Sequence, residues 1–108
     1  ANKSKMKVSI IQGIDRKMPL KDLASSNRLS MEDLMKELDA IVVSGTKVNL
    51  DYYIDENVVE YSREDIMDYF MESDSDSVEV AYKELQEDDI TIEEIQLIRI
   101  KFLSDLAN

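Results

Sequence analysis

Apolar and polar residues alternate along most of the chain with the period of an α-helix. In residues 4–14 the apolar positions recur at about three-residue spacing, which predicts a short amphipathic helix. The buried side of this helix is expected to contain Val8, Ile10, Ile11 and Ile14. The stretch "DRKMPL" interrupts the pattern, and Pro19 favours a second helix over residues 20–26, because proline fits the first helical turn. Its buried side is expected to be Leu20, Leu23 and Ala24.

A third helix is predicted after the polar turn "SSNRLS". Ser30 and Asp33 have the S-x-x-[DE] spacing of a helix start, in which the side chains cap free backbone N–H groups. Gly45 is expected to end the helix, because glycine adopts the left-handed cap conformation without a Cβ clash. The positions expected to face the core are Met31, Leu34, Leu38, Ile41 and Val42.

After Gly45 the pattern changes to strict alternation. Apolar and polar side chains alternate over residues 47–55, which predicts a half-buried strand, and "VVSGTKV" favours folding it back into a small β-hairpin. Three helices followed by such a hairpin are typical of a winged helix. Residues 5–55 are therefore predicted to form a winged-helix-like helix–turn–helix module, and residues 1–4 a disordered start or the remnant of a tag.

Residues 56–108 are expected to form an acidic three-helix unit. Ser62, Ser77 and Thr91 are its predicted helix starts. The last helix carries a stripe of Ile92, Ile95, Ile98, Phe102 and Leu106, and further apolar residues predict that it packs on two sides. The predicted fold class is therefore mainly α, with the acidic unit packed on the winged-helix-like module in one compact domain.

Charge is distributed unevenly along the chain. The net charge is −11, yet residues 1–50 contain nine Lys/Arg against six Asp/Glu, whereas residues 51–108 contain four against eighteen. If the basic residues of residues 1–50 share one side, they can follow a nucleic-acid backbone without reading bases. The tentative nucleic-acid-binding residues are Lys5, Lys7, Arg16, Lys17, Arg28 and Lys47. The alternative is that they are scattered, solvated side chains.

The outward face of the third helix does not suit DNA reading. On a helical wheel that face contains Glu32, Lys36, Asp39 and Val43. Glu32 lies four residues before Lys36, the favourable order for an ion pair, and Asp39 is expected to be uncompensated. Because DNA affinity comes largely from Lys and Arg at phosphates, this helix is expected to support the fold or to dock a partner.

Composition excludes most catalytic and metal chemistry. The chain has no histidine or cysteine, which removes thiolate nucleophiles, imidazole bases and the usual zinc ligands. "DSDSVEVAYKEL" lacks the glycine and the spaced glutamate of a calcium loop. With two glycines there is no phosphate-binding loop, and no apolar run is long enough to span a bilayer. No catalytic residue and no metal site are predicted.

Three stretches carry a resemblance to a known family: "KVSIIQGIDRKMPLKDLA", "LDAIVVSGTKVNLDYYIDE" and "IRIKFLSDLAN". They resemble the C-terminal helix–turn–helix module of bacterial, particularly Bacteroidetes-type, RecQ-family ATP-dependent DNA helicases. The resemblance implies an accessory domain whose ATP, magnesium and zinc sites lie in upstream helicase domains. It implies a cytoplasmic, nucleoid-associated location and no catalytic residue in this chain.

The function expected from the sequence is a non-catalytic accessory domain of a RecQ-type helicase that assists DNA engagement or protein contact. Its expected partners are DNA, bound weakly and without sequence preference, the upstream helicase domains, and a possible protein partner, with no membrane. The main rival is a protein-interaction module whose acidic half docks a basic partner. A free-standing transcription regulator is a third alternative, which the acidic third helix disfavours.

Overall fold

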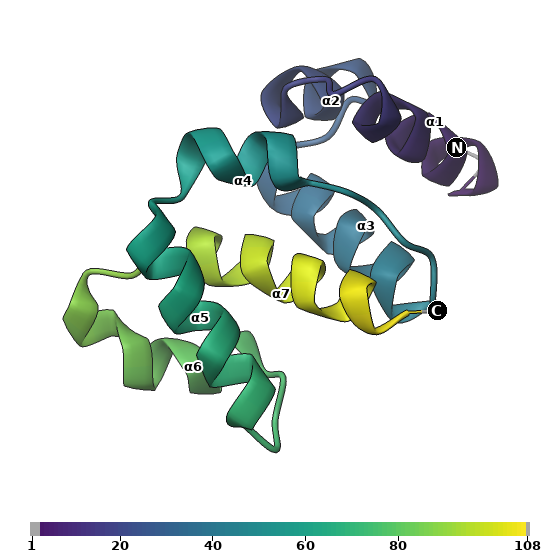
Figure 1. The fold of residues 1–108 in the computed structure, drawn as a ribbon. Helices are drawn as coiled ribbons and strands as arrows, with labels where there is room; N and C mark the ends of the chain where they lie inside the picture. The colour runs from purple at the N-terminus through teal and green to yellow at the C-terminus, as the bar shows by residue number, and fades with distance from the viewer. Residues whose placement is uncertain (1–2, 108) are drawn as a thin grey trace.

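The computed structural model describes residues 3–107, and these residues form helices and connecting segments with no β-strand (Figure 1). The predicted mainly α class is confirmed, whereas the predicted hairpin is absent from the described residues. The elements are α1 (Lys3–Asp15), α2 (Leu20–Ser26), α3 (Met31–Val43), α4 (Asp51–Asn57), α5 (Glu60–Glu72), α6 (Val78–Leu85), a 3-10 turn (Gln86–Asp88) and α7 (Ile92–Leu106).

Helix α7 lies at the centre of the molecule and packs against α3, α4, α5 and α6 (Figure 1). Ile95, Ile98 and Ile100 are at most 1% exposed. Packing on more than one side, as the sequence predicted, is confirmed. Two members of the predicted stripe are wrong, because Ile92 is 46% exposed and Leu106 is 61% exposed at the ends of the helix.

Helices α1, α2 and α3 form the helix–turn–helix part of the chain. The bounds predicted for α2 are confirmed, and Leu20, Leu23 and Ala24 are buried. Helix α1 comes very close to α2 at Gly13, where an added Cβ would lie 2.4 Å from Leu23 Cδ1. Val8 was predicted to be buried but is 52% exposed, because the buried side of α1 runs through Ile10, Gly13 and Ile14.

The three helices of this part end with the same hydrogen-bond pattern. In each, two backbone N–H groups after the helix return to carbonyls of the last turn, at Lys17 and Met18, at Arg28 and Leu29, and at Gly45 and Thr46. This pattern needs one left-handed residue. Gly45 supplies it for α3 with φ 96°, as predicted, whereas Lys17 (φ 58°) and Arg28 (φ 57°) supply it for α1 and α2.

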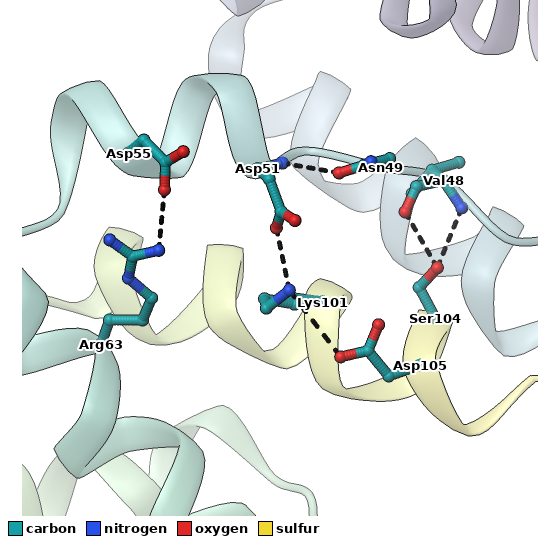
Figure 2. Close-up of polar contacts among 8 residues, drawn as sticks. All are labelled: Val48, Asn49, Asp51, Asp55, Arg63, Lys101, Ser104 and Asp105. Atoms are coloured by element: carbon teal, nitrogen blue, oxygen red, sulfur yellow. Dashed lines mark hydrogen bonds and ion pairs between the residues drawn. The ribbon is translucent and has the colours of Figure 1, made fainter.

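The segment predicted as a strand is a short connection followed by α4. Helix α3 continues to Val43, so the residues expected to pair with the strand are helical. The backbone groups of Val48 instead bond to one side chain: the Ser104 hydroxyl of α7 accepts from its N–H at 3.0 Å and donates to its carbonyl at 2.9 Å (Figure 2). The Asn49 side chain accepts a hydrogen bond from the Asp51 N–H, which starts α4.

The apolar residues of this segment fit helical spacing as well as alternation. Leu50, Ile54 and Val58 are four residues apart and all buried. Apolar residues that alternate over a few positions also include i, i+4 pairs, so the local pattern fits a strand and a helix equally well. Packing of this segment on α7 therefore selected the helix. The domain boundary expected after residue 55 therefore falls within α4.

Three of the four predicted helix starts are confirmed. The Ser30 and Ser77 side chains accept hydrogen bonds from Asp33 and Val80, and Thr91 forms a reciprocal capping box with Glu94. Ser62 is a wrong start, because α5 begins at Glu60 and leaves Ser62 buried within the helix.

The predicted disordered start at residues 1–4 is contradicted in part. Helix α1 begins at Lys3, so Lys3 and Ser4 belong to a helix. The remaining two residues of that start, 1 and 2, lie outside the described residues.

Candidate nucleic-acid interface

The candidate basic residues lie on α1 and on the three connections that follow α1, α2 and α3. Lys5 is exposed and Lys7 half-buried on α1. Residues two positions apart point to different sides of a helix, so these two lysines do not share one face. Arg16, Lys17 and Arg28 are exposed just after the C-terminal ends of α1 and α2. The partial negative charge of a helix C-terminus stabilises cations at such positions.

The structure brings some of these residues together. Lys17 lines a cleft beside α4, and Lys47 lines a second cleft along residues 47–50, the connection that precedes α4. Asp15, Asn49 and Asp51 line both clefts. Lys17, with Arg16 next to it in sequence, and Lys47 therefore both lie near Asp15 at the end of α1.

Lys5, Lys7 and Arg28 line neither cleft. The six candidates thus do not form one continuous basic patch around these clefts. The clefts also contain carboxylates, including Asp15 and Asp51, which disfavour phosphate binding within them. The exposed turns therefore remain as the accessible basic surface.

Three cations that the sequence did not single out tie residues 56–107, the second half of the chain, to residues 3–55, the first half. Arg63 of α5 contacts Asp55 of α4 at 2.7 Å, and Lys101 of α7 contacts Asp51 of α4 at 2.8 Å (Figure 2). The third, Arg99 of α7, donates a hydrogen bond to Asp39 of α3. All three pairs join a cation after residue 60 to a carboxylate before residue 56.

Arg99 also anchors the connection between α5 and α6. Its guanidinium donates to the backbone carbonyl of Asp76 at 2.7 Å and to the Asp76 carboxylate at 3.3 Å. The side chain is 13% exposed, and this burial lowers the pKa of the Arg99 guanidinium below its usual value. Arginine still carries its charge at neutral pH, because its ordinary pKa is far higher.

Lys101 is held in its charged form. The hydrogen bond to Asp51 raises the pKa of the Lys101 ammonium group, and the charges of Asp51 and Asp105 add to this against the opposing effect of burial. Asp105 lies one turn further along α7, with its carboxylate 3.8 Å from the Lys101 nitrogen (Figure 2).

The outward face of α3 is as acidic as predicted, with one correction. The Glu32 and Lys36 pair is present at 3.7 Å. Asp39, which was expected to be uncompensated, is paired with Arg99 because α7 packs along α3. Glu37 of α3 pairs with Lys3 of α1 at 3.4 Å. Helix α3 therefore contacts α1, α2 and α7, and the acidic face that it leaves exposed does not suit a DNA groove.

No group of three or more Asp and Glu side chains arranged to hold a metal ion occurs among residues 3–107. Over the same residues, none of the helices has the length and apolar character needed to cross a membrane.

A short helix, a tight turn and a longer capped helix, supported by a preceding helix, define the first part of the chain as a helix–turn–helix domain. Residues 4–54 match the family model described as "RecQ-1-like, helix-turn-helix domain", so this part of the chain is similar to that family. The match covers just under half of the chain and ends within α4. A search of curated proteins finds no match.

The match confirms the family to which the sequence was compared. It includes two of the three stretches that carried the resemblance, up to residue 54, whereas "IRIKFLSDLAN" lies beyond it. The Bacteroidetes type stays a prediction.

Proposed function

We propose that this chain is a non-catalytic accessory part of a RecQ-type ATP-dependent DNA helicase, and that its helix–turn–helix domain makes weak, sequence-independent contacts with the DNA backbone. The contacts are assigned to the exposed cations of the turns, Arg16, Lys17, Arg28 and Lys47, with Lys5 and Lys7 of α1 as further contacts. The acidic helices after residue 56 keep the remaining surfaces away from DNA.

The observation that carries this proposal is the sorting of charge between the two halves. Contact between them compensates three carboxylates of the first half, Asp39, Asp51 and Asp55, with cations of the second half. No such ion pair is found for Arg16, Lys17, Arg28 or Lys47 within residues 3–107. Packing therefore leaves the surface of the first half more basic than its sequence suggests.

The backbone at two of these cations supports the same assignment. Lys17 and Arg28 occupy the left-handed position that Gly45 occupies after α3. A residue with a side chain costs roughly 1–2 kcal/mol in that conformation. Cation and helix-dipole attraction offsets part of this cost, and phosphate binding supplies a reason to keep a long basic side chain at both places.

The proposal leaves the helicase chemistry to other domains. This chain has no cysteine or histidine to hold zinc and no glycine-rich loop to hold ATP phosphates. ATP, magnesium and zinc are assigned to helicase domains upstream of this region, which are the proposed intramolecular partners, and a cytoplasmic, nucleoid-associated location belongs to the same proposal.

The test uses glycine at the two left-handed turns. Lys17→Gly with Arg28→Gly removes two charges, and stability is expected to equal or exceed that of the parent, because glycine adopts both left-handed conformations without the Cβ cost. Affinity for a labelled duplex, followed by fluorescence anisotropy at low salt, is expected to fall at least tenfold. The slope of log affinity against log salt should flatten by about 0.9 for each lost phosphate contact.

The matched control also removes two exposed cations. Lys36→Gln with Lys83→Gln changes the net charge equally, but Lys36 faces Glu32 and Lys83 lies on the acidic α6. This control is expected to change affinity less than threefold. Equal losses in both variants would show that only net charge matters, and a base-specific loss with Lys36→Gln alone would assign DNA reading to α3.

A second candidate function is a protein-interaction module that uses its acidic half. Residues 56–108 contain sixteen Asp/Glu and four Lys/Arg. Of these four cations, Arg63, Arg99 and Lys101 are engaged with carboxylates of the first half. Absence of any DNA binding at low salt would favour this candidate.

A further inference from the structure

A groove with an apolar floor and an acidic rim lies where the first turns of α3 and α7 meet α4. Its volume is about 340 Å³, and its lining residues are Met31, Glu32, Met35, Tyr53, Ile92, Glu93, Gln96 and Leu97. Met35 and Leu97 are buried at its floor, whereas Ile92 is 46% exposed at its edge. The groove is therefore a preformed apolar surface between three elements of the fold.

The charges along this groove have one sign. Glu32 and Glu93 line it, and no lysine or arginine does. Lys36 is the cation nearest in sequence, but its pair with Glu32 is long at 3.7 Å and both side chains are more than 70% exposed. Such exposed pairs contribute little, so an incoming cation can replace Lys36.

A second depression continues from the groove around the start of α7. Its lining includes Tyr82, Asp89 and Ile90, and it shares Ile92 and Glu93 with the groove. It too is lined by carboxylates without a cation. Ile92 thus stands between two hollows whose three carboxylates are Glu32, Asp89 and Glu93.

Helix capping explains part of this pattern. Acidic residues in first turns stabilise helices, which accounts for Glu32 and Glu93 at the starts of α3 and α7. It does not account for an exposed isoleucine between them, because leaving a large aliphatic side chain in water forfeits the roughly 1.5–3 kcal/mol available from burying it.

We propose that these two hollows form a docking groove for a segment of a partner protein in which an aliphatic or aromatic side chain is flanked by lysine or arginine. The apolar side chain enters between Met31, Met35 and Ile92, where flexible methionines adapt to its shape. The flanking cations face Glu32, Glu93 and Asp89. Nucleic acid is excluded as the occupant, because its phosphates would meet these carboxylates.

The groove and the basic turns are separate surfaces. None of the cations assigned to DNA lines either hollow. The docking proposal therefore does not depend on DNA binding, and the two can fail independently.

The test is selection from a random peptide display library on the immobilised whole chain. The expected result is enrichment of peptides that place Leu, Ile, Phe or Trp beside Lys or Arg. A selected peptide, made synthetically, should shift amide NMR signals of α3 and α7 around the groove. Ile92→Ser and Glu93→Lys should each weaken its binding at least tenfold.

Matched controls separate the groove from general effects. Val80→Ser removes an aliphatic side chain of equal exposure, 45%, from α6, and Glu60→Lys reverses a first-turn charge on α5. Both should change binding less than twofold, and circular dichroism should show all four variants folded. No enrichment, acidic or uncharged selected peptides, or equal weakening by the controls would overturn the proposal. Self-association of the chain that Ile92→Ser abolishes would overturn the choice of occupant.

Discussion

The two halves of this chain use their charges in opposite ways. The first half contributes carboxylates to the contact between the halves and leaves most of its turn cations exposed. The second half contributes the cations Arg63, Arg99 and Lys101 to that contact and leaves its carboxylates exposed. The net charge of a segment is therefore a poor guide to the charge that its surface presents. Packing makes the difference between the two surfaces larger than the sequence indicates.

The halves also differ in how they are held. Helices α1 to α3 are connected by short turns with local hydrogen bonds. The second half is joined to them through α7, whose buried residues touch helices from both halves. The comparison predicts that the two halves unfold together, and substitutions at the shared core and at the contact should test it.

The largest effect is expected from the core of α3. Leu38 is fully buried, so Leu38→Ala should lower the free energy of unfolding by about 2–5 kcal/mol through lost burial and a residual cavity. Val43→Ala, on the same helix at 62% exposure, is the control and should change it by less than about 0.5 kcal/mol. The free energy of unfolding of both variants is measured by urea titration, with circular dichroism as the signal.

The same titration tests whether the halves are coupled. Tyrosine fluorescence reports mainly on the second half and on α4, because no tyrosine precedes Tyr52. We expect its midpoint to shift with that of the circular dichroism signal in Leu38→Ala. A fluorescence midpoint that stays unchanged would show that the second half unfolds independently.

Loss of Arg99 is expected to have the next largest effect. Arg99→Leu removes the bonds to Asp39 and Asp76 and leaves both carboxylates unpaired, at a cost of about 1.5–3 kcal/mol, as for hydrogen bonds to charged groups. Lys83→Leu is the control, because Lys83 is exposed on α6. If the charge comparison is right, Arg99→Leu also weakens duplex binding, since Asp39 becomes uncompensated.

A smaller loss is expected when the connection before α4 loses its side-chain partner. Ser104→Ala removes both hydrogen bonds to Val48 and leaves a partly buried N–H without a partner. The expected cost is about 1–2 kcal/mol by chemical denaturation. Ser104→Thr keeps the hydroxyl and serves as a comparison. Equal stability of Ser104→Ala and the parent would show that water satisfies Val48 instead.

The smallest effect is expected at alkaline pH. The pKa of Lys101 is raised above its ordinary 10.5, mainly by Asp51, and that of Tyr52 above its ordinary 10.0, mainly by burial. Because the folded protein holds these protons more tightly, their contribution is complete below pH 10 and is lost as the pH rises through the folded pKa values.

The free energy of unfolding should therefore fall above about pH 10, and Lys101→Met should make this fall shallower while lowering stability at pH 8. Lys83→Met is the control and should keep the slope of the parent. A fall equally steep in Lys101→Met and the parent would assign the alkaline loss to other groups.

Local sequence determined the parts of the fold that depend on neighbouring residues. Pro19 and the caps at Ser30, Ser77 and Thr91 mark helix starts, because each acts on backbone within one turn. The core face of α3 was predicted in four of its five positions: Leu34, Leu38, Ile41 and Val42 are buried, whereas Met31 is only half-buried and the buried Met35 was not predicted. The family resemblance was carried by stretches within residues 7–24, 38–56 and 98–108, and the match over residues 4–54 supports the first two.

Tertiary structure decided what the local pattern left open. Residues 47–55 are compatible with a strand or a helix, and the choice depended on α7, which supplies Ser104 to Val48 and Lys101 to Asp51 across fifty or more residues of chain. The pairing of Asp39 with Arg99 and the exposure of Ile92 could not be predicted from the sequence either, because both depend on how α7 lies along α3. Sequence spacing specifies which residues share a face of one helix, whereas the packing of separate helices determines which charges meet and which remain in water.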